Sequence, residues 1–385
     1  MAMGRRFSLA VGVAASVAVL AGCGSNSDSD STNASTSGAG AASSVKQEAS
    51  ARVAEATKVP AFNGPTEPVD MASLKGKRVM ILSGNNGVPF VAATAKAGEE
   101  AAKAAGFDVV SYDGKGQPSG WSKGIQQAVT QGMAGIFTVG VPPEVVKTAL
   151  ADAKKNNVPV INVFDLSSPD APLEPEGLSA SVTVDYAKDG SLLGDFIVAN
   201  SDTDAPHVLV LGDASFPSVA AIQKGAVDQI KKLAPDAKII EKNVPVSKLA
   251  TNLAATVQTE LRKDPEIKWI VADYDAEAIY IVPAVKQAGK ANEVQVVGHD
   301  AVPQNLKWVQ DGDVQTFDVG DPAGWGGWGG VDALARAILG MEQPDQNIPT
   351  AAFTKESLQG KDVENEDDLF GTAYRDAYLK LWGIQ

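Results

Sequence analysis

Short apolar runs alternate along this chain with longer segments whose apolar residues recur at helical spacing. The first apolar runs cover residues 78–82, 108–112, 135–139 and 158–163. They are rich in β-branched residues and apolar on both faces, as strands buried inside a parallel sheet are. The helical face before the fourth run consists of Val145, Val146, Ala149, Leu150 and Ala153, after the pair Pro142-Pro143. This order predicts a β-α-β-α series, which is typical of α/β domains.

A second series of the same kind follows. Its apolar runs cover residues 207–211, 238–240, 268–271 and 294–297. The helix before the third of these runs is marked by Leu249, Leu253, Val257 and Leu261, which are spaced four apart. Pro283 lies inside the otherwise helical segment 276–289, so we expect that helix to begin late or to be kinked. Two parallel α/β domains in tandem are therefore expected, related in architecture and without a convincing sequence repeat.

The beginning of the chain has the layout of a secretory signal. Arg5 and Arg6 precede the uncharged, apolar residues 7–20. These 14 residues are fewer than the roughly 20 that a helix needs to cross a bilayer, which favours a cleaved signal over a permanent anchor. Residues 24–60 are mostly Ser, Ala, Asp, Thr, Asn and Gly. They predict a flexible tether, because they offer little apolar surface to offset the entropy of ordering.

The net charge indicates which partners to exclude, and the chain length indicates the number of domains. The net charge of −14 becomes −16 once a signal with two arginines is removed. A surface this acidic repels phosphate backbones, and no basic stripe offsets it, so nucleic acid is not expected as a partner. The region from about residue 60 to 385 is longer than one hydrophobic core usually serves, which predicts two domains. With Cys23 as the single cysteine, no disulfide within the chain can hold them.

Four motifs carry a resemblance to a known family. They are Asn-Asn-Gly-Val-Pro-Phe at 85–90, Gln-Ala-Val-Thr-Gln-Gly-Met-Ala-Gly-Ile at 127–136, Asn-Val-Pro-Val-Ile at 157–161 and Val-Val-Gly-His-Asp at 296–300. In this order and spacing they resemble the ribose-binding group of type I periplasmic binding proteins, the receptors of sugar ABC transporters. The resemblance runs from about residue 77 to 340. It implies an α/β fold of two doubly wound parallel-sheet lobes, joined by a three-strand hinge, with the ligand held in the cleft.

The residues Leu20-Ala21-Gly22-Cys23 resemble the lipobox of bacterial lipoproteins. This implies that Cys23 becomes the first residue and carries diacylglycerol, which would anchor the protein outside the cytoplasm. The Arg5-Arg6 pair leaves both general secretion and twin-arginine export open. We expect a signal peptide at 1–22, the lipidated cysteine and tether at 23–60, a first lobe at 61–184 plus 320–340, and a second lobe at 185–319 plus 341–385.

Candidate binding residues follow from the expected sheets, because open α/β sheets bind ligands beyond the carboxyl ends of their strands. Residues at those ends are Asn85, Asn86, Phe90, Asp113, Gln117, Trp121, Phe164, Asp165, Asp213, Phe216, Asp273, Tyr274, Asp275, His299 and Asp300. Carboxylates and amides suit the fixed directions of sugar hydroxyls, and aromatic rings stack on the apolar face of a sugar. Asp113 and Asp213 serve equally well as turn or cap residues. The resemblance places Asp165, Asp300 and Phe90 where the family contacts its ligand.

Departures from the family pattern argue against ribose itself. Ribose binders carry an Asp-Arg pair where this chain has Phe164-Asp165, and their second arginine falls on Lys224. Their asparagine falls near Tyr274. Because two guanidinium groups are missing, a sugar, polyol or related ligand with more apolar face is expected. The predicted ligand-binding set is Asn86, Phe90, Trp121, Phe164, Asp165, Lys224, Tyr274, Asp300 and Trp325.

The glycine-rich segment 321–330 holds two tryptophans three residues apart. Glycines allow close backbone approach and leave room for an indole to face a cleft. We expect Trp325 near the hinge and facing the cleft, with Trp328 in the core; the alternative is that both pack inside.

The function expected from these features is that of a lipid-anchored solute-binding protein of an ABC importer. It would act as a monomer with permease subunits as partners and without cofactor or metal. A ligand-sensing lipoprotein that serves a membrane signalling partner is an alternative, because the same fold serves both roles. A carbohydrate-active enzyme is the other alternative, but the sequence has no nucleophile elbow, P-loop or recognised metal motif. His299 and Asp300 are adjacent, and neighbouring residues on a strand point to opposite faces, which argues against an acid–base pair.

Overall fold

The computed structural model describes residues 35–384, with side chains from residue 43 onward. The expected signal, Cys23 and the first part of the tether lie outside the described residues. Residues 42–385 form one compact unit, and the account below concerns that unit. None of the described helices is long and apolar enough to cross a membrane.

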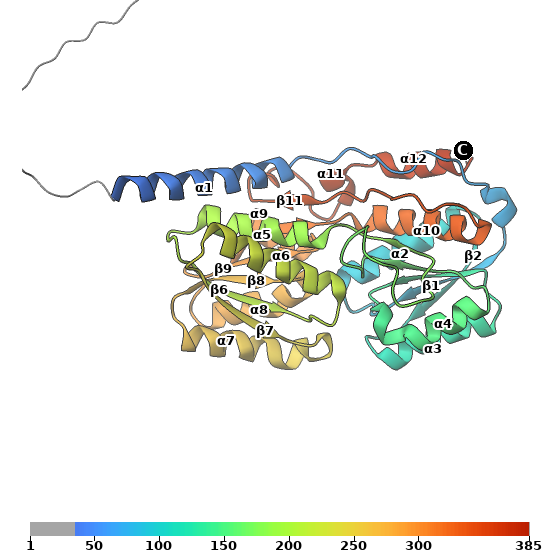
Figure 1. The fold of residues 1–385 in the computed structure, drawn as a ribbon, viewed down its shortest axis with the longest axis horizontal. Coiled ribbons are helices and arrows are strands. Elements are labelled where there is room, and N and C mark those ends of the chain that lie inside the picture. Colours follow the sequence, from blue (N-terminus) through green and yellow to red (C-terminus); the bar gives the residue numbers. More distant parts are fainter. Residues whose placement is uncertain (1–34, 385) are drawn as a thin grey trace, which may run out of the picture. The chain divides into compact units, whose positions relative to one another are not determined.

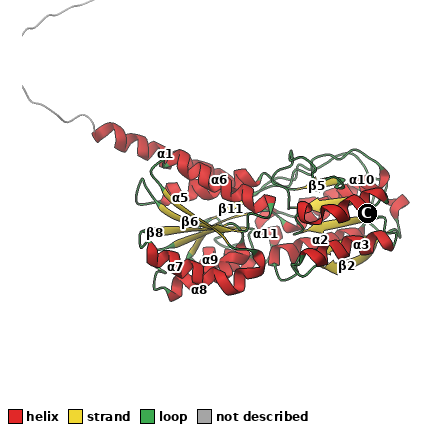
Figure 2. Ribbon diagram, turned by 60° about the horizontal axis from the view of Figure 1, so that its bottom comes forward, coloured by secondary structure: helices red, strands yellow, loops and turns green. Residues whose placement is uncertain are grey.

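Two sheets organise the unit, one in each lobe (Figures 1 and 2). The first lobe has the parallel order β2-β1-β3-β4-β5, with β1 (Arg78–Ser83), β2 (Asp108–Asp113), β3 (Gly135–Val139), β4 (Val160–Val163) and β5 (Ala180–Val182). The second lobe has the order β11-β10-β9-β8-β6-β7, with β6 (His207–Gly212), β7 (Lys238–Asn243), β8 (Ile267–Ala272), β9 (Gln295–His299), β10 (Gln315–Gly320) and β11 (Ala351–Phe353). Strand β11 runs antiparallel to β10. The two predicted α/β series are confirmed, while β5 and β11 were not predicted.

Helices cover both faces of each sheet (Figure 2). The first lobe contains α2 (Pro89–Ala104), α3 (Pro118–Thr130), α4 (Lys147–Lys155), α10 (Ala323–Leu339) and α12 (Ala373–Leu381), with 3₁₀ turns η1 (Met71–Leu74) and η2 (Pro143–Val146). The second lobe contains α5 (Tyr186–Asn200), α6 (Pro217–Leu233), α7 (Ala254–Lys263), α8 (Asp275–Gln287), α9 (Pro303–Asp311) and α11 (Glu366–Phe370), with a 3₁₀ turn η3 (Val246–Lys248) and a π turn η4 (Leu249–Leu253) before α7. Proline occupies the first position of α2, α3, α6 and α9, where its missing N–H costs nothing.

Helix α8 runs through Pro283. It begins at Asp275, eight residues before the proline, so the expected late start was wrong. The carbonyl that loses its partner belongs to Ile279, a residue that is 37 % exposed.

The chain passes between the lobes after β5, after β10 and after α10, as the three-strand hinge predicted. It crosses again between α11 and α12, because α12 packs on α10 of the first lobe. The ring of Trp382 stacks on Trp328 with centroids 5.3 Å apart, and its Nε1 donates to Asp332 Oδ1 at 2.9 Å. The assignment of residues 341–385 to the second lobe therefore fails for α12.

Residues 35–56, part of the expected tether, form helix α1 (Ser35–Ala56). Arg52 donates two hydrogen bonds to the buried Asp195 of α5, at 2.8 and 2.7 Å. Lys46 Nζ donates to the carbonyl of Ser201 at 2.8 Å, and Ala49 and Val53 are buried. The Ala-rich composition of this segment provides few large apolar side chains, but alanine has a high helix propensity. A few contacts with the second lobe are therefore enough to dock α1. A flexible tether across this segment was the wrong prediction.

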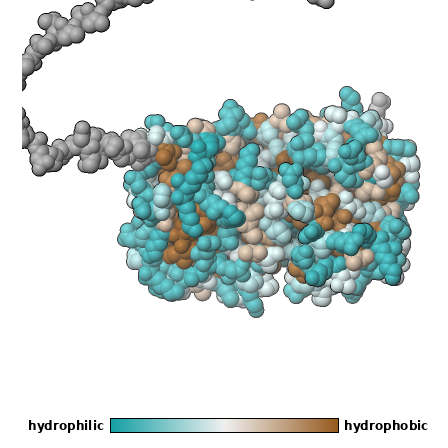
Figure 3. Space-filling model, viewed as in Figure 1, coloured by the Kyte–Doolittle hydropathy of each residue, from teal (hydrophilic) through white to brown (hydrophobic). Residues whose placement is uncertain are grey.

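The face drawn in Figure 3 is mainly hydrophilic, with apolar patches scattered over it. The large apolar side chains that remain exposed in the described region are Val59, Val145, Leu173 and Ile279, which are far apart in the sequence.

Candidate ligand-binding site

A cavity lies where the carboxyl ends of the two sheets face each other. The first lobe contributes Asn85, Val88, Phe90, Val91, Gly116, Trp121, Val139, Gly140, Phe164 and Asp165. The second lobe contributes Tyr186, Phe216, Ser218, Val219, Ile222, Val246, Asp273, Tyr274, His299 and Asp300. All of them lie at or just beyond strand ends or in the helix turns that follow, which is where open α/β sheets bind ligands.

Aromatic rings form much of the cavity wall. Phe90, in the first turn of α2, contacts Phe164 with ring centroids 5.2 Å apart. Trp121 of α3 meets Phe216 of the second lobe at 6.4 Å. The indole Nε1 of Trp121 donates to the carbonyl of Gly84 at 2.8 Å, which fixes the ring against the end of β1. These rings offer the flat apolar faces that a sugar or polyol ring packs against.

Two cavity residues have unusual backbone conformations. Phe164 has φ +64° and Asp300 has φ +122°, and Ala301 follows with φ +56°. Non-glycine residues in these regions cost of order 1–3 kcal/mol each, and such residues cluster at functional sites. The ring of Phe164 also needs Gly326 of α10, because a Cβ there would lie 2.0 Å from Phe164 Cε2.

In the first lobe, hydrogen bonds hold the side-chain carboxyl group of Asp165 in place. Its Oδ2 accepts hydrogen bonds from Asn162 Nδ2 at 2.9 Å and from the backbone N–H of Val141 at 3.1 Å. Burial raises the pKa of Asp165 to about 7, although both hydrogen bonds act in the opposite direction. The group is therefore held at the cavity wall and exchanges its proton near neutral pH.

Further carboxyl groups lie at the ends of β8 and β9. Burial raises the pKa values of Asp273 and Glu277, and repulsion between the two carboxylates raises that of Asp273 further. Both side-chain oxygens of Asp273 lack a hydrogen-bond partner among the described residues. Burial also raises the pKa of Asp300, against a hydrogen bond with His299. The described lining includes no lysine or arginine, so its charge is that of carboxyl groups and His299 alone.

His299 and Asp300 contact each other despite being adjacent. His299 Nδ1 lies 3.3 Å from Asp300 Oδ1. Strand β9 ends at His299, and the positive φ of Asp300 turns its side chain back, so strand alternation does not apply to this pair. The expectation that they point apart was wrong.

Six of the nine predicted binding residues line the cavity: Phe90, Trp121, Phe164, Asp165, Tyr274 and Asp300. Asn86 does not, because it is exposed and its backbone N–H is bound to Asp113, while its neighbour Asn85 takes the lining position. Lys224 does not either; it is exposed on α6 and pairs with Asp228.

Trp325 lies in the core of the first lobe. It is 2 % exposed and makes edge contacts with Phe62 at 5.5 Å and Tyr374 at 5.3 Å. Trp328 is buried beside it against Tyr374 and Trp382. Both tryptophans pack inside, so the expectation that Trp325 faces the cleft was wrong.

Several lining residues were missed from the sequence. Tyr186 begins α5 directly after the first crossing between the lobes, and its hydroxyl donates to the carbonyl of Phe164 at 3.2 Å. Ser218, Val219 and Ile222 belong to the first turns of α6. Pro217 after the strand end at Gly212 was the available signal for that helix start.

Comparisons with known proteins agree with this fold. The family model described as "Periplasmic binding protein domain" matches residues 79–342. The D-allose-binding periplasmic protein of Escherichia coli (strain K12) is 29 % identical over 154 residues, 40 % of this chain and 49 % of that protein. The galactofuranose-binding protein YtfQ of the same organism is 25 % identical over 292 residues, 72 % of this chain and 85 % of that protein.

Solved structures show the same architecture. A solute-binding protein from Agrobacterium vitis with bound allitol has a TM-score of 0.66 at 21 % identity, covering 74 % of this chain and 98 % of that one. One from Bacillus halodurans C-125 with bound myo-inositol has a TM-score of 0.66 at 17 % identity, covering 76 % and 98 %. With its two parallel-sheet lobes and the cavity between them, this chain belongs to the periplasmic binding protein family, as a type I member of the ribose-binding-like group.

Proposed function

We propose that this protein is the extracytoplasmic solute-binding component of an ABC importer and captures a small hydroxylated ligand, such as a sugar or polyol, between its lobes. The observation that carries this proposal is the cavity itself, where aromatic walls from both lobes surround carboxyl groups at the strand ends. Family membership and relatives named for allose, ribose and galactofuranose support it.

The chemistry of the lining selects the kind of ligand. Asp165, Asp273 and Asp300 provide acceptors for hydroxyl hydrogens, or donors when protonated. Anionic ligands are disfavoured, because the described lining offers no lysine or arginine to balance their charge. The rings of Phe90, Trp121 and Phe216 suit a ligand with an apolar face.

Lipid anchoring completes the proposal. Cys23 follows the apolar run and resembles a lipidation site, which would hold the protein at the outer face of the cell membrane. Metabolic labelling with a radioactive fatty acid tests this, with incorporation expected for the natural chain and none for Cys23→Ser. Labelling of Cys23→Ser would contradict the anchor without affecting the binding function.

A thermal-shift screen of the purified full chain tests the binding function. A ligand that binds only the folded state raises the melting temperature, by an amount that grows with the ratio of its concentration to its dissociation constant. We expect neutral sugars or polyols, among them allose, ribose, allitol and myo-inositol, to raise the melting temperature and to remain chemically unchanged. Stabilisation by anionic ligands alone, or conversion of a stabilising sugar to product, would refute the proposal.

A further inference from the structure

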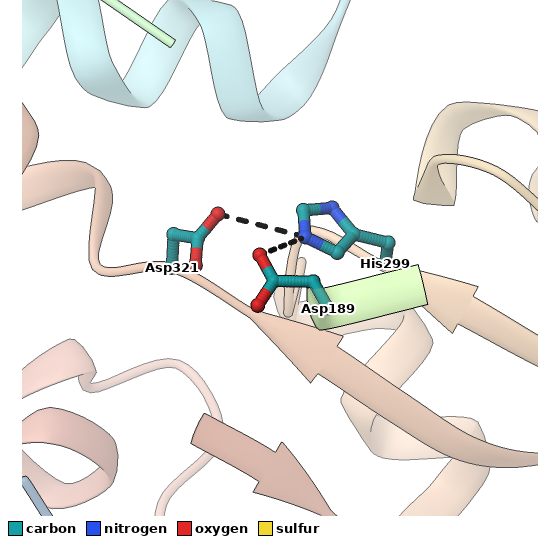
Figure 4. A group of neighbouring side chains, drawn as sticks. All are labelled: Asp189, His299 and Asp321. Atoms are coloured by element: carbon teal, nitrogen blue, oxygen red, sulfur yellow. Dashed lines mark ion pairs between the residues drawn. The ribbon is translucent and has the colours of Figure 1, made fainter. Parts of the chain in front are cut away.

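Three buried side chains converge beside the ligand cavity, at the hinge between the lobes (Figure 4). Asp189 lies in the first turn of α5, His299 ends β9, and Asp321 directly follows β10. Each side chain is at most 1 % exposed. Both carboxylates point at the ring of His299, whose Nε2 lies 3.5 Å from Asp189 Oδ2 and 3.5 Å from Asp321 Oδ2.

The three atoms that face one another have no hydrogen-bond partner among the described residues. A separation of 3.5 Å is longer than the roughly 2.7–3.2 Å of an N–H···O bond. Buried polar atoms without partners are rare in folded proteins, and each one calls for a specific explanation. Three of them around one point indicate a shared ligand at that point.

Neighbouring side chains contact the atoms of His299 and Asp321 that face away from the centre of the cluster. His299 Nδ1 faces Asp300 Oδ1 at 3.3 Å, and Thr350 Oγ1 donates to Asp321 Oδ1 at 2.9 Å. A hydrogen bond from Nδ1–H to Asp300 leaves the lone pair on Nε2, directed toward Asp189 and Asp321. Metal-binding histidines are held in this way, with a carboxylate on the nitrogen that does not bind the ion.

We propose that Asp189, His299 and Asp321 bind a divalent transition-metal ion, for which zinc is the best fit. Zinc–nitrogen and zinc–oxygen bonds are about 2.0–2.2 Å, so two ligand atoms of a tetrahedral site lie ~3.4 Å apart. The two separations of 3.5 Å in the cluster match this value. One imidazole and two carboxylates also form a nitrogen–oxygen set that suits zinc, and two carboxylates balance its charge.

Three protein ligands leave the fourth tetrahedral position of the ion to water. The location lets the ion join segments of the hinge. Asp189 follows the crossing after β5, and Asp321 begins the crossing after β10, so one ion joins both segments to β9. His299 and Asp300 line the ligand cavity, and Asp321 and Asp300 line a neighbouring one, so the cluster lies between two cavities. This inference does not depend on which solute the protein binds.

Zinc binding by the full chain tests the proposal. Protein stripped with a chelator is titrated with Zn²⁺ by calorimetry, and bound metal is counted after gel filtration. We expect one zinc per chain and an increase in melting temperature. His299→Gln should weaken binding by roughly 100-fold or more, beyond the effect of losing an outer-shell partner. Zinc X-ray absorption of the natural chain should show a nitrogen and oxygen shell at about 2.0–2.2 Å.

His207→Gln is the matched control. His207, the other of the chain's two histidines, pairs with Asp264 at 3.0 Å on the opposite end of the second-lobe sheet and should be irrelevant to zinc. Asp189→Asn and Asp321→Asn keep the side-chain shape and remove one anionic ligand each. If His299→Gln does not fold, weakened zinc binding by these two variants tests the proposal instead. The proposal is overturned if the natural chain retains no zinc, if these variants bind it as tightly, or if His207→Gln loses it. In that case, a protonated His299 shared by the two carboxylates accounts for the cluster.

Discussion

The indole of Trp121 and the ring of Phe216 meet across the cavity, with centroids 6.4 Å apart and planes at 74°. Trp121 belongs to α3 of the first lobe, and Phe216 caps α6 of the second. Nearby, the backbone N–H of Ser218 donates to the carbonyl of Asp165 at 3.2 Å, which also joins the lobes. The structure is therefore the closed form, and rotation about the hinge would break both contacts.

Trp121 should report closure by its fluorescence. It is 4 % exposed here, and separation of the lobes removes its contact with Phe216 and lets water reach the ring. We expect a saturating sugar ligand to shift the emission to the blue. Trp121→Phe should abolish most of that shift.

Trp325→Phe is the control for this experiment, since Trp325 packs within the first lobe against Phe62 and Tyr374. Its loss should leave the shift nearly intact. Small-angle scattering checks closure independently through a fall in the radius of gyration. An unchanged radius at saturation would argue against lobe closure, whatever the emission does.

Asp300 should be needed for tight ligand binding. A hydrogen bond to a charged group contributes roughly 1.5–3 kcal/mol, so Asp300→Asn is expected to lower affinity about ten- to a hundredfold. Calorimetry in metal-free buffer separates this effect from any effect through His299. Lys224→Ala should leave the affinity unchanged, because Lys224 is exposed and pairs with Asp228. Equal losses for both variants would show that the cavity has been wrongly identified.

The pKa of Asp165 predicts a pH dependence of stability. Burial raises that pKa to about 7 in the folded protein, so between about pH 4 and 7 the folded state keeps a proton that the unfolded chain loses. The free energy of unfolding therefore falls as pH rises through this window. Relative to Asp165→Asn, the natural chain should lose up to about 4 kcal/mol between pH 4 and pH 8.

Urea unfolding of both chains without ligand, from pH 4 to 8, measures the difference. Asp170→Asn changes an exposed carboxylate and should run parallel to the natural chain. A constant difference between the natural chain and Asp165→Asn across the range would contradict the raised pKa.

Gly326 should control the cavity through Phe164. A Cβ at residue 326 lies 2.0 Å from Phe164 Cε2, so Gly326→Ala must displace the ring. We expect affinity to fall about tenfold and stability by about 1–3 kcal/mol from overpacking. Gly329→Ala is the matched control on the same helix, where the nearest atom is Tyr378 Oη at 3.0 Å, away from the cavity. If Gly329→Ala lowered affinity as much, the effect would belong to the helix and not to the ring.

The docking of α1 should contribute measurably to the free energy of unfolding. Arg52→Gln leaves the buried carboxylate of Asp195 with Gln229 as its remaining side-chain donor. Because Arg52 is itself 42 % exposed, the expected loss is roughly 1–3 kcal/mol, below that of a fully buried pair. Arg78→Gln breaks an exposed pair with Asp108 and should cost at most about 1 kcal/mol. Equal, small effects in urea unfolding would indicate that α1 contributes no stability.

The local sequence pattern was sufficient to predict the strands and part of the ligand-binding cavity. Continuous apolar runs identified the central strands of both sheets, because strands covered on both faces bury every side chain. Parallel strands bring their carboxyl ends to one edge, so Phe164, Asp165, Tyr274 and Asp300 could be assigned to the cavity from their position after a strand.

The direction of a helical side chain was decided by tertiary packing. Helix α6 turns Ser218, Val219 and Ile222 to the cavity, and Lys224, two residues beyond Ile222 and about 200° around the helix, faces outward. In α10, Gly326 packs against Phe164 and Gly327 against α2, while Trp325 and Trp328 face Phe62 and α12. Those partners lie far away in the sequence, and no local pattern identifies them.

The sequence by itself therefore determined the α/β series and the strand-end residues of the cavity, because these depend on periodicity and local order, and its motifs indicated the family by resemblance. Tertiary structure decided the docking of α1 through Arg52 and Asp195, and the convergence of Asp189, His299 and Asp321 at the hinge. Arg52 and Asp195 are 143 positions apart, and Asp189 lies more than 100 positions before His299 and Asp321, so the crossings between the two lobes bring them together. Contacts of that range follow from how whole elements pack, which a single chain's local pattern does not encode.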